Sequence, residues 1–116
     1  MSGTLTKRPS AKQSRQALEK IAEVFRLLAE PTRLAIIQEL KGGPQTVGAL
    51  VESLATSQAN VSKQLKTLYD GGFLAREKEG ASVRYQLDDE IILPLCELVC
   101  QRLNKQASEA APFYSI

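Results

Sequence analysis

The side chains between positions 57 and 67 are of the kinds that hydrogen-bond to nucleic-acid bases and phosphates. The segment reads SQANVSKQLKT. Glutamine and asparagine amides can pair with adenine, a serine hydroxyl donates or accepts, and lysine reaches guanine or a phosphate. The residues that we expect to contact double-stranded DNA here are Ser57, Gln58, Asn60, Ser62, Lys63, Gln64 and Lys66. The same residue types also form the solvated face of ordinary helices, so the neighbouring elements decide between the two interpretations.

The two cysteines, Cys96 and Cys100, form a second group with chemical potential. On a helix, side chains four residues apart have Cβ atoms about 5–6 Å from each other, so both sulfurs could bind one soft metal or metalloid. Oxidation and reactive-sulfur chemistry at a thiol is a second alternative. A disulfide within the helix does not fit, because bonded cysteines need Cβ atoms about 3.8 Å apart. The pair also lies on an apolar stripe, where free cysteine behaves as a small buried hydrophobe, so a purely structural role stays open.

Hydrophobic spacing places the polar run on the second of two short helices. Apolar residues in 47–54 fall at i, i+3, i+4 and i+7, which is one face of a helix, and those in 61–68 fall at i, i+4 and i+7. Thr46 and Ser57 stand where the two N-caps belong. Two such helices joined by a tight turn predict a helix-turn-helix, whose second helix enters the major groove of DNA. The first turn of that helix, residues 58–62, should lie nearest the base edges.

A β-hairpin is predicted directly after this motif. Gly71-Gly72 ends the helix, since glycine adopts the left-handed conformation of a C-cap. An extended run over 73–78, turn residues at 79–82 and an alternating strand over 83–88 follow. We expect Arg76, Lys78 and Arg84 to gather on one solvent-facing ribbon, with Lys78 and Arg84 as DNA contacts. A solubilising charged turn is the alternative.

The remaining periodicity predicts helices over about 15–29, from Pro31 to about residue 40, and over about 90–106. The expected fold is mainly α (α+β): about five helices, with a two-stranded hairpin wing before the last helix. Residues 1–14 are expected to be a flexible polar tail before one DNA-binding and dimerisation domain, 15–106. Residues 107–116 are expected to be a loose C-terminal tail, in which apolar Phe113 and Tyr114 could pack.

Two runs, LLAEPTRLAIIQEL (27–40) and TVGALVESLATSQANVSKQLKTLYDGGFLAREKEGASVRYQL (46–87), resemble the bacterial ArsR/SmtB family of winged helix-turn-helix repressors. The resemblance covers about residues 18–103. It implies a homodimer that pairs through its first and last helices, binds a near-palindromic operator and is released by an effector. The dimer, the repressor role and the sensing step come from this resemblance and not from residue spacing.

The sensor sites of that family can be compared with this chain position by position. The family's arsenic-type Cys-Val-Cys run corresponds here to Thr46-Val47-Gly48, so that site is absent. Its zinc-type site on the last helices keeps Asp89, but the histidine positions are Ile91 and Arg102, and the chain contains no histidine. The effector is therefore expected at Cys96 and Cys100, through thiol redox chemistry, reactive sulfur, or a soft metal or metalloid such as arsenite.

Composition excludes some classes of protein. The 116 residues carry a net charge of only +2, so DNA affinity must come from the local placement of lysine and arginine. No histidine base, serine triad or glycine-rich phosphate loop points to an enzyme. No apolar stretch is long enough to span a membrane and no signal peptide is evident, so a cytoplasmic location is expected. A thiolate-bound metal or metalloid is the one cofactor considered. The alternative functions are a winged-helix regulator with structural cysteines and a protein-interaction module.

Overall fold

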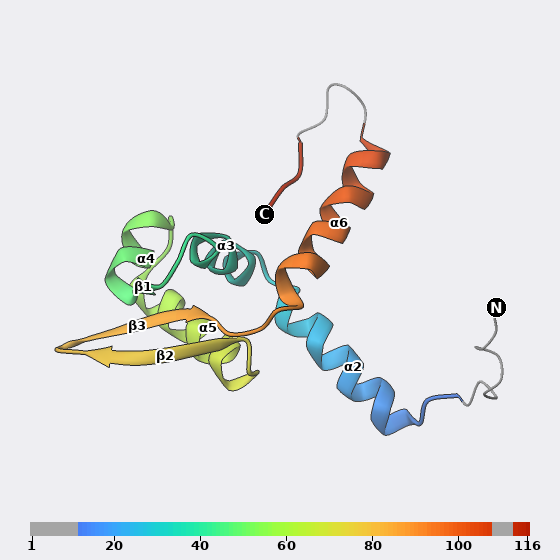
Figure 1. Cartoon of the computed structure of the whole chain (residues 1–116), viewed down its shortest axis with the longest axis horizontal. Coiled ribbons are helices and arrows are strands. Elements are labelled where there is room, and N and C mark those ends of the chain that lie inside the picture. The colour runs from blue at the N-terminus through green and yellow to red at the C-terminus, as the bar shows by residue number, and fades with distance from the viewer. Residues whose placement is uncertain (1–11, 108–112) are drawn as a thin grey trace.

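The computed structural model describes residues 12–107 and 113–116, in which five helices and three strands are present (Figure 1). In chain order they are α2 (Arg15–Leu28), α3 (Pro31–Leu40), β1 (Gln45–Thr46), α4 (Val47–Ser53), α5 (Gln58–Asp70), β2 (Leu74–Glu79), β3 (Ser82–Leu87) and α6 (Ile92–Gln106). The predicted winged helix-turn-helix is confirmed, with α4 and α5 as its two helices and β2–β3 as its wing. Most of the tail expected at 1–14 lies outside the described residues.

The hydrophobic core lies where α3, α4 and α5 meet the base of the wing. Its fully buried side chains come from all three helices and include Ile36, Ile37, Leu50, Val61, Leu65 and Leu68. Four of these, from Leu50 onward, belong to the two periodic patterns of the helix-turn-helix. Burial of this apolar face fixes the angle at which α5 presents its other face to solvent.

The sheet has a third strand that the sequence did not predict. The strand order is β1-β3-β2, and β1 pairs antiparallel with β3 through Gln45 opposite Tyr85 and Thr46 opposite Arg84. The predicted two-stranded wing, β2–β3, is confirmed, and β1 adds a strand to the sheet outside it. A strand of two residues is too short to show alternation in its sequence, and only its pairing with β3 defines it.

The helix ends follow local side-chain chemistry. The hydroxyls of Thr46 and Ser57 accept hydrogen bonds of 3.1 Å from the backbone amides of Ala49 and Asn60, which confirms both predicted N-caps. At the end of α5 the left-handed residue is Gly72, with φ of +87°, whereas Gly71 stays in the right-handed helical region. A glycine thus ends the helix in the left-handed conformation as predicted, but this glycine is Gly72 and not Gly71.

The start of α6 is capped by a side chain outside the helix. The Asp89 carboxylate accepts hydrogen bonds from the backbone amides of Ile91 (2.7 Å) and Ile92 (3.2 Å). The helix therefore begins at Ile92, two residues later than predicted. Asp89, which the family comparison places at a zinc-type site, serves here as the helix cap.

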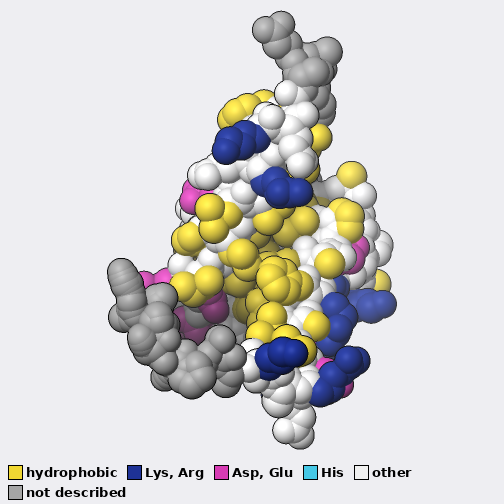
Figure 2. All heavy atoms as spheres, turned by 90° about the vertical axis from the view of Figure 1, so that its right-hand side faces the viewer, with side chains coloured by type: hydrophobic (Ala, Val, Ile, Leu, Met, Phe, Trp, Pro, Cys, Tyr) yellow, Lys and Arg dark blue, Asp and Glu magenta, His cyan; other side chains and the backbone are white. Residues whose placement is uncertain are grey.

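α2 and α6 project from the core and leave apolar side chains uncovered (Figures 1 and 2). α2 has no buried residue although its apolar face is well formed, and Phe25 is 57% exposed. Figure 2 shows a broad apolar area on this side of the molecule. The exposed apolar residues of the two helices are Leu18, Ile21, Val24, Phe25, Leu98, Val99 and Leu103. None of the helices in the described ranges is long and apolar enough to cross a membrane.

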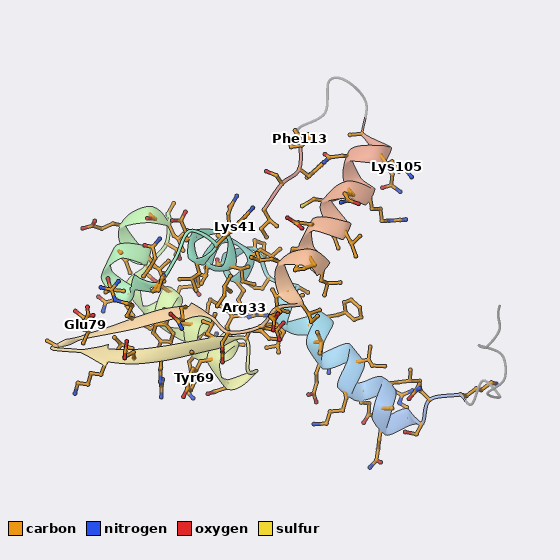
Figure 3. The ribbon with its side chains drawn as sticks, in the orientation of Figure 1. Arg33, Lys41, Tyr69, Glu79, Lys105 and Phe113 are labelled. Carbon is orange, nitrogen blue, oxygen red and sulfur yellow. The ribbon has the colours of Figure 1, made fainter. Side chains whose placement is uncertain are left out.

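A single arginine, Arg33 in the first turn of α3, ties three helices together. Its guanidinium donates to the carbonyl oxygens of Leu27 (2.7 Å) and Arg26 (3.0 Å) at the end of α2, and to the Gln64 side-chain oxygen (2.7 Å) on α5. The last carbonyl oxygens of a helix have no amide donor within that helix, and the Arg33 guanidinium provides the missing donors for α2. Figure 3 shows Arg33 at the centre of the molecule, between these elements. No pattern in the sequence pointed to this role.

Replacing Arg33 by methionine keeps an apolar stem and removes these charged hydrogen bonds. We expect Arg33→Met to lower the free energy of unfolding by about 2–3 kcal/mol, because buried Gln64 loses its donor. Urea denaturation measures this change.

Arg15→Met is the matched control, since Arg15 forms only an exposed pair with Glu19 and should cost about 0.5 kcal/mol or less. Gln64→Leu should also cost less in the Arg33→Met background than in the wild type. Equal losses for the two arginine variants would contradict the role given to Arg33.

Candidate nucleic-acid interface and thiol pair

The outer face of α5 presents the side chains expected to contact DNA. Gln58, Ser62, Lys63 and Lys66 are all exposed. Lys66 forms an ion pair of 2.7 Å with Asp70 one turn later, but both side chains remain more than half exposed. Such a surface pair is weak, so the lysine can exchange its partner for a phosphate. This row is polar, carries two ammonium groups and lies opposite the buried apolar face.

Asn60 and Gln64 occupy a different environment from the rest of the row. Gln64 is only 6% exposed, and its amide nitrogen donates to the Asn60 side-chain oxygen at 3.0 Å. The Asn60 amide nitrogen in turn donates to the Thr56 hydroxyl at 2.9 Å. With Arg33 bound to the other end of Gln64, the chain of hydrogen bonds runs from α3 to the turn before α5.

These bonds change the roles of two predicted contacts. Gln64 is buried with both ends of its amide in use, so the expected direct contact with DNA does not fit its position. Asn60 is half-buried, and both ends of its amide are also bonded within the protein. The Ser57 hydroxyl caps the helix. The three residues hold the first turn of α5 in place, whereas the exposed neighbours face outward.

The two faces of the wing carry different charges. In the observed register Glu77 lies directly opposite Arg84, and Arg76 lies opposite Tyr85. Because directly opposed residues share a face, Arg84 lies with Glu77 and Glu79, away from Arg76 and Lys78. Arg84 also forms an ion pair of 2.8 Å with Glu79. Arg76, Lys78 and Arg84 thus all lie on the predicted ribbon, but Arg84 is on the opposite face from the other two, because side chains alternate along each strand.

Arg76 is fixed beside the recognition helix. Its guanidinium carbon lies 4.0 Å from the centre of the Tyr69 ring, in the last turn of α5, which is a cation–π arrangement. Lys78 is exposed two residues further along the same strand, toward the wing tip. The cationic face of the wing is thus the one carrying Arg76 and Lys78. The sequence could have indicated which side chains share a face, because alternate residues of a strand point to the same side and the turn residues set which residues of the two strands lie opposite each other.

Cys96 and Cys100 lie near each other on α6 as predicted, in a largely apolar setting. Cys96 is 6% exposed and Cys100 is half-buried. Burial, and to a lesser extent the neighbouring Cys100, raises the pKa of the Cys96 thiol above its ordinary value. Within the described ranges no three His, Cys, Asp or Glu side chains gather as a metal-binding group. One chain therefore offers two sulfurs, of which the Cys96 thiol resists ionisation because it is buried.

Comparison with known proteins agrees with this architecture. A helix-turn-helix domain model matches residues 28–77. The chain is 36% identical over 90 residues to the HTH-type transcriptional regulator NmtR of Mycobacterium tuberculosis, covering 78% of this chain and 75% of that one. It is also 36% identical over 77 residues to a probable mercury resistance operon repressor of Streptomyces lividans, covering 66% and 62%.

Solved structures extend the likeness to the whole fold. The homodimeric winged helix-turn-helix DNA-binding domain of Mb0332 from Mycobacterium bovis, described as a possible ArsR-family regulator, superposes with a TM-score of 0.68. Its sequence identity is 29%, and the match covers 90% of this chain and 98% of that one. The relatives named here are transcriptional regulators and repressors. The chain belongs to the ArsR/SmtB family of winged helix-turn-helix, DNA-binding transcriptional regulators.

Proposed function

We propose that this protein is a homodimeric repressor that binds a near-palindromic operator through α5 and the wing, and that an effector acting at Cys96 and Cys100 releases it. The observation that carries the DNA-binding part is the exposed row on α5, with the helix held from behind by Arg33 and Gln64. In a two-fold dimer the two copies of α5 would enter successive major grooves, about 34 Å apart.

The exposure of each side chain supports different roles for the predicted contacts: reading bases, binding phosphates, or positioning the helix. Gln58 and Ser62 are the exposed polar residues at the start of α5, where recognition helices read base edges. Lys63, Lys66 and Lys78 are exposed cations suited to phosphates. Ser57, Asn60 and Gln64 position these residues from behind. We assign Arg84 a weaker contribution than Lys78, because it shares its face of the wing with two carboxylates, Glu77 and Glu79, that would repel a phosphate.

The DNA contacts can be tested with a duplex selected from a random pool by the wild-type protein. We expect Lys63→Ala and Lys78→Ala each to weaken binding severalfold, because each removes a cation that neutralises a phosphate. Each should also reduce the slope of log K against log salt by about one. Fluorescence anisotropy titration over a series of salt concentrations measures both quantities.

Two variants serve as comparisons. Lys20→Ala removes an exposed lysine from α2 and should leave the slope unchanged, and Arg84→Ala should fall between the two groups. If Lys63→Ala and Lys78→Ala behave like Lys20→Ala, the proposed surface does not contact DNA. A wild-type protein that selects no duplex would favour the protein-interaction module.

The dimer interface is proposed to be the uncovered apolar side of α2 and α6. Contiguous exposed apolar surface of this kind marks an association site, and a single surface patch can pair with itself across a two-fold axis. The NMR structure of the Mb0332 domain is a homodimer with the same fold. Pairing through these helices would bury Leu18, Ile21 and Leu98, which are each roughly half exposed in the single chain.

A charge placed in this interface should separate the two chains. We expect Ile21→Glu to shift the protein to monomer and to weaken DNA binding, because an unpaired carboxylate would be buried between subunits. Gln16→Glu adds the same charge to the polar side of the same helix and should leave the dimer intact. Size-exclusion chromatography with light scattering distinguishes the two outcomes, and a dimeric Ile21→Glu protein would place the interface elsewhere.

The effector step is proposed from the thiol pair, with thiol oxidation, reactive sulfur and a soft metalloid as the alternatives. The raised pKa of Cys96 disfavours the thiolate that a metal cation requires. Arsenite makes no such demand, because each arsenic–sulfur bond forms as a thiol proton leaves with an arsenic-bound hydroxide as water. A third sulfur ligand is not available within the described part of one chain, so the metalloid would take two.

Replacing both cysteines by alanine tests this step while keeping the site apolar. We expect operator binding by the wild type to weaken after arsenite or a disulfide oxidant, and binding by Cys96→Ala/Cys100→Ala to remain unchanged. Because burial raises the pKa of the Cys96 thiol, alkylation of Cys96 should be slow at neutral pH. Its rate should rise at a higher pH than the alkylation rate of an exposed thiol does. An equal response of both proteins would make the cysteines structural.

A further inference from the structure

An apolar chamber lies between α3, α6, the end of α2 and the segment 113–116. Its volume is about 670 Å³, which is within the usual range for small-molecule sites. Apolar side chains such as Phe25, Leu34 and Leu103 line most of it, and Cys96 and Cys100 form part of the wall. None of the lining residues is Asp, Glu, Lys or Arg; the side-chain amide of Gln38 is among the few polar groups.

The fourth wall of the chamber is the C-terminal strap, defined here as residues 113–116. The Asn104 side chain on α6 donates to the Tyr114 carbonyl oxygen (2.9 Å) and accepts from the Tyr114 amide (2.8 Å), as a neighbouring strand would. The Lys41 ammonium at the end of α3 donates to the Ile116 backbone oxygen (2.8 Å). Figure 3 shows Lys41 and Phe113 at opposite ends of this strap.

The strap is part of the loose tail predicted over 107–116, in which the apolar residues Phe113 and Tyr114 were expected to be able to pack. Its backbone is bonded to two helices, and the Ile116 side chain packs against the hydrophobic core. Hydrogen bonds thus hold the backbone of Tyr114 and Ile116, and the strap borders one side of an apolar space. A segment that is held by three hydrogen bonds can border the chamber and also detach from it at modest cost.

We propose that this chamber is a binding site for an uncharged, predominantly apolar small molecule, retained by the C-terminal strap. A charged ligand would lose its hydration without meeting an opposite charge in the lining, whereas an apolar ligand gains by leaving water. Such a ligand would lie against the two thiols. The site needs no reaction at sulfur, so it stands apart from the proposed effector chemistry.

N-Phenyl-1-naphthylamine, a neutral dye that brightens in apolar surroundings, is a suitable probe. We expect saturable binding of one dye per chain and slower alkylation of Cys100 by N-ethylmaleimide when the dye is bound. Ala35→Phe fills the chamber from α3 and should weaken dye binding severalfold. Gln101→Phe adds the same ring on α6 outside the chamber and should bind the dye as the wild type does.

Asn104→Ala supplies a second measurement that does not depend on filling the chamber. Loss of both Tyr114 hydrogen bonds should release the strap and speed the alkylation of Cys100 without dye, while circular dichroism shows an unchanged fold. The proposal is overturned if dye binding is unaffected by Ala35→Phe, or if the dye gives Cys100 no protection. It is also overturned if dye binding disappears as dimer forms, because the chamber would then be filled by a second copy of the chain.

Discussion

The arrangement of this regulator depends on the guanidinium of Arg33. This group binds two carbonyl oxygens at the end of α2 and the side-chain oxygen of Gln64 on α5. Three donors of one planar cation thus connect the helix with the uncovered apolar face to the helix with the exposed polar face. Arginine suits this position because its planar fork presents several donors at once, which the single ammonium of lysine cannot reproduce. Gln64 in turn donates a hydrogen bond to Asn60, and Asn60 donates one to Thr56 in the turn before α5.

This internal network explains why the recognition surface is divided into two layers. The inner layer of buried Gln64 and half-buried Asn60 forms its hydrogen bonds within the protein, since an amide removed from water and left unpaired is destabilising. The outer layer of Gln58, Ser62 and Lys63 keeps its polar groups in water. The wing shows a similar division, because Arg84 is paired with Glu79 while Lys78 on the opposite face is exposed.

The apolar side of the molecule holds its second organising constraint. α2 and α6 extend beyond the core, so much of their apolar surface lies uncovered by the chain's own helices. The C-terminal strap covers one part and forms one wall of the open space beside Cys96 and Cys100. The proposed dimer would cover the remainder. The thiols therefore lie beside the surface through which the subunits are proposed to pair, far along the chain from the residues of α5.

Local sequence is sufficient to specify the helices, their caps and the hairpin, because these depend on neighbours within a few residues. Thr46 and Ser57 cap their helices as predicted, and the apolar spacing of 47–54 and 61–68 indicates the helix-turn-helix. Which polar residues face solvent is settled only by the packing of the whole chain. The Arg33–Gln64 bond joins residues 31 positions apart, the β1 strand exists only through β3, and the strap reaches Lys41 from 75 positions away. No local pattern encodes such contacts, since they arise only when packing of the core brings distant segments together.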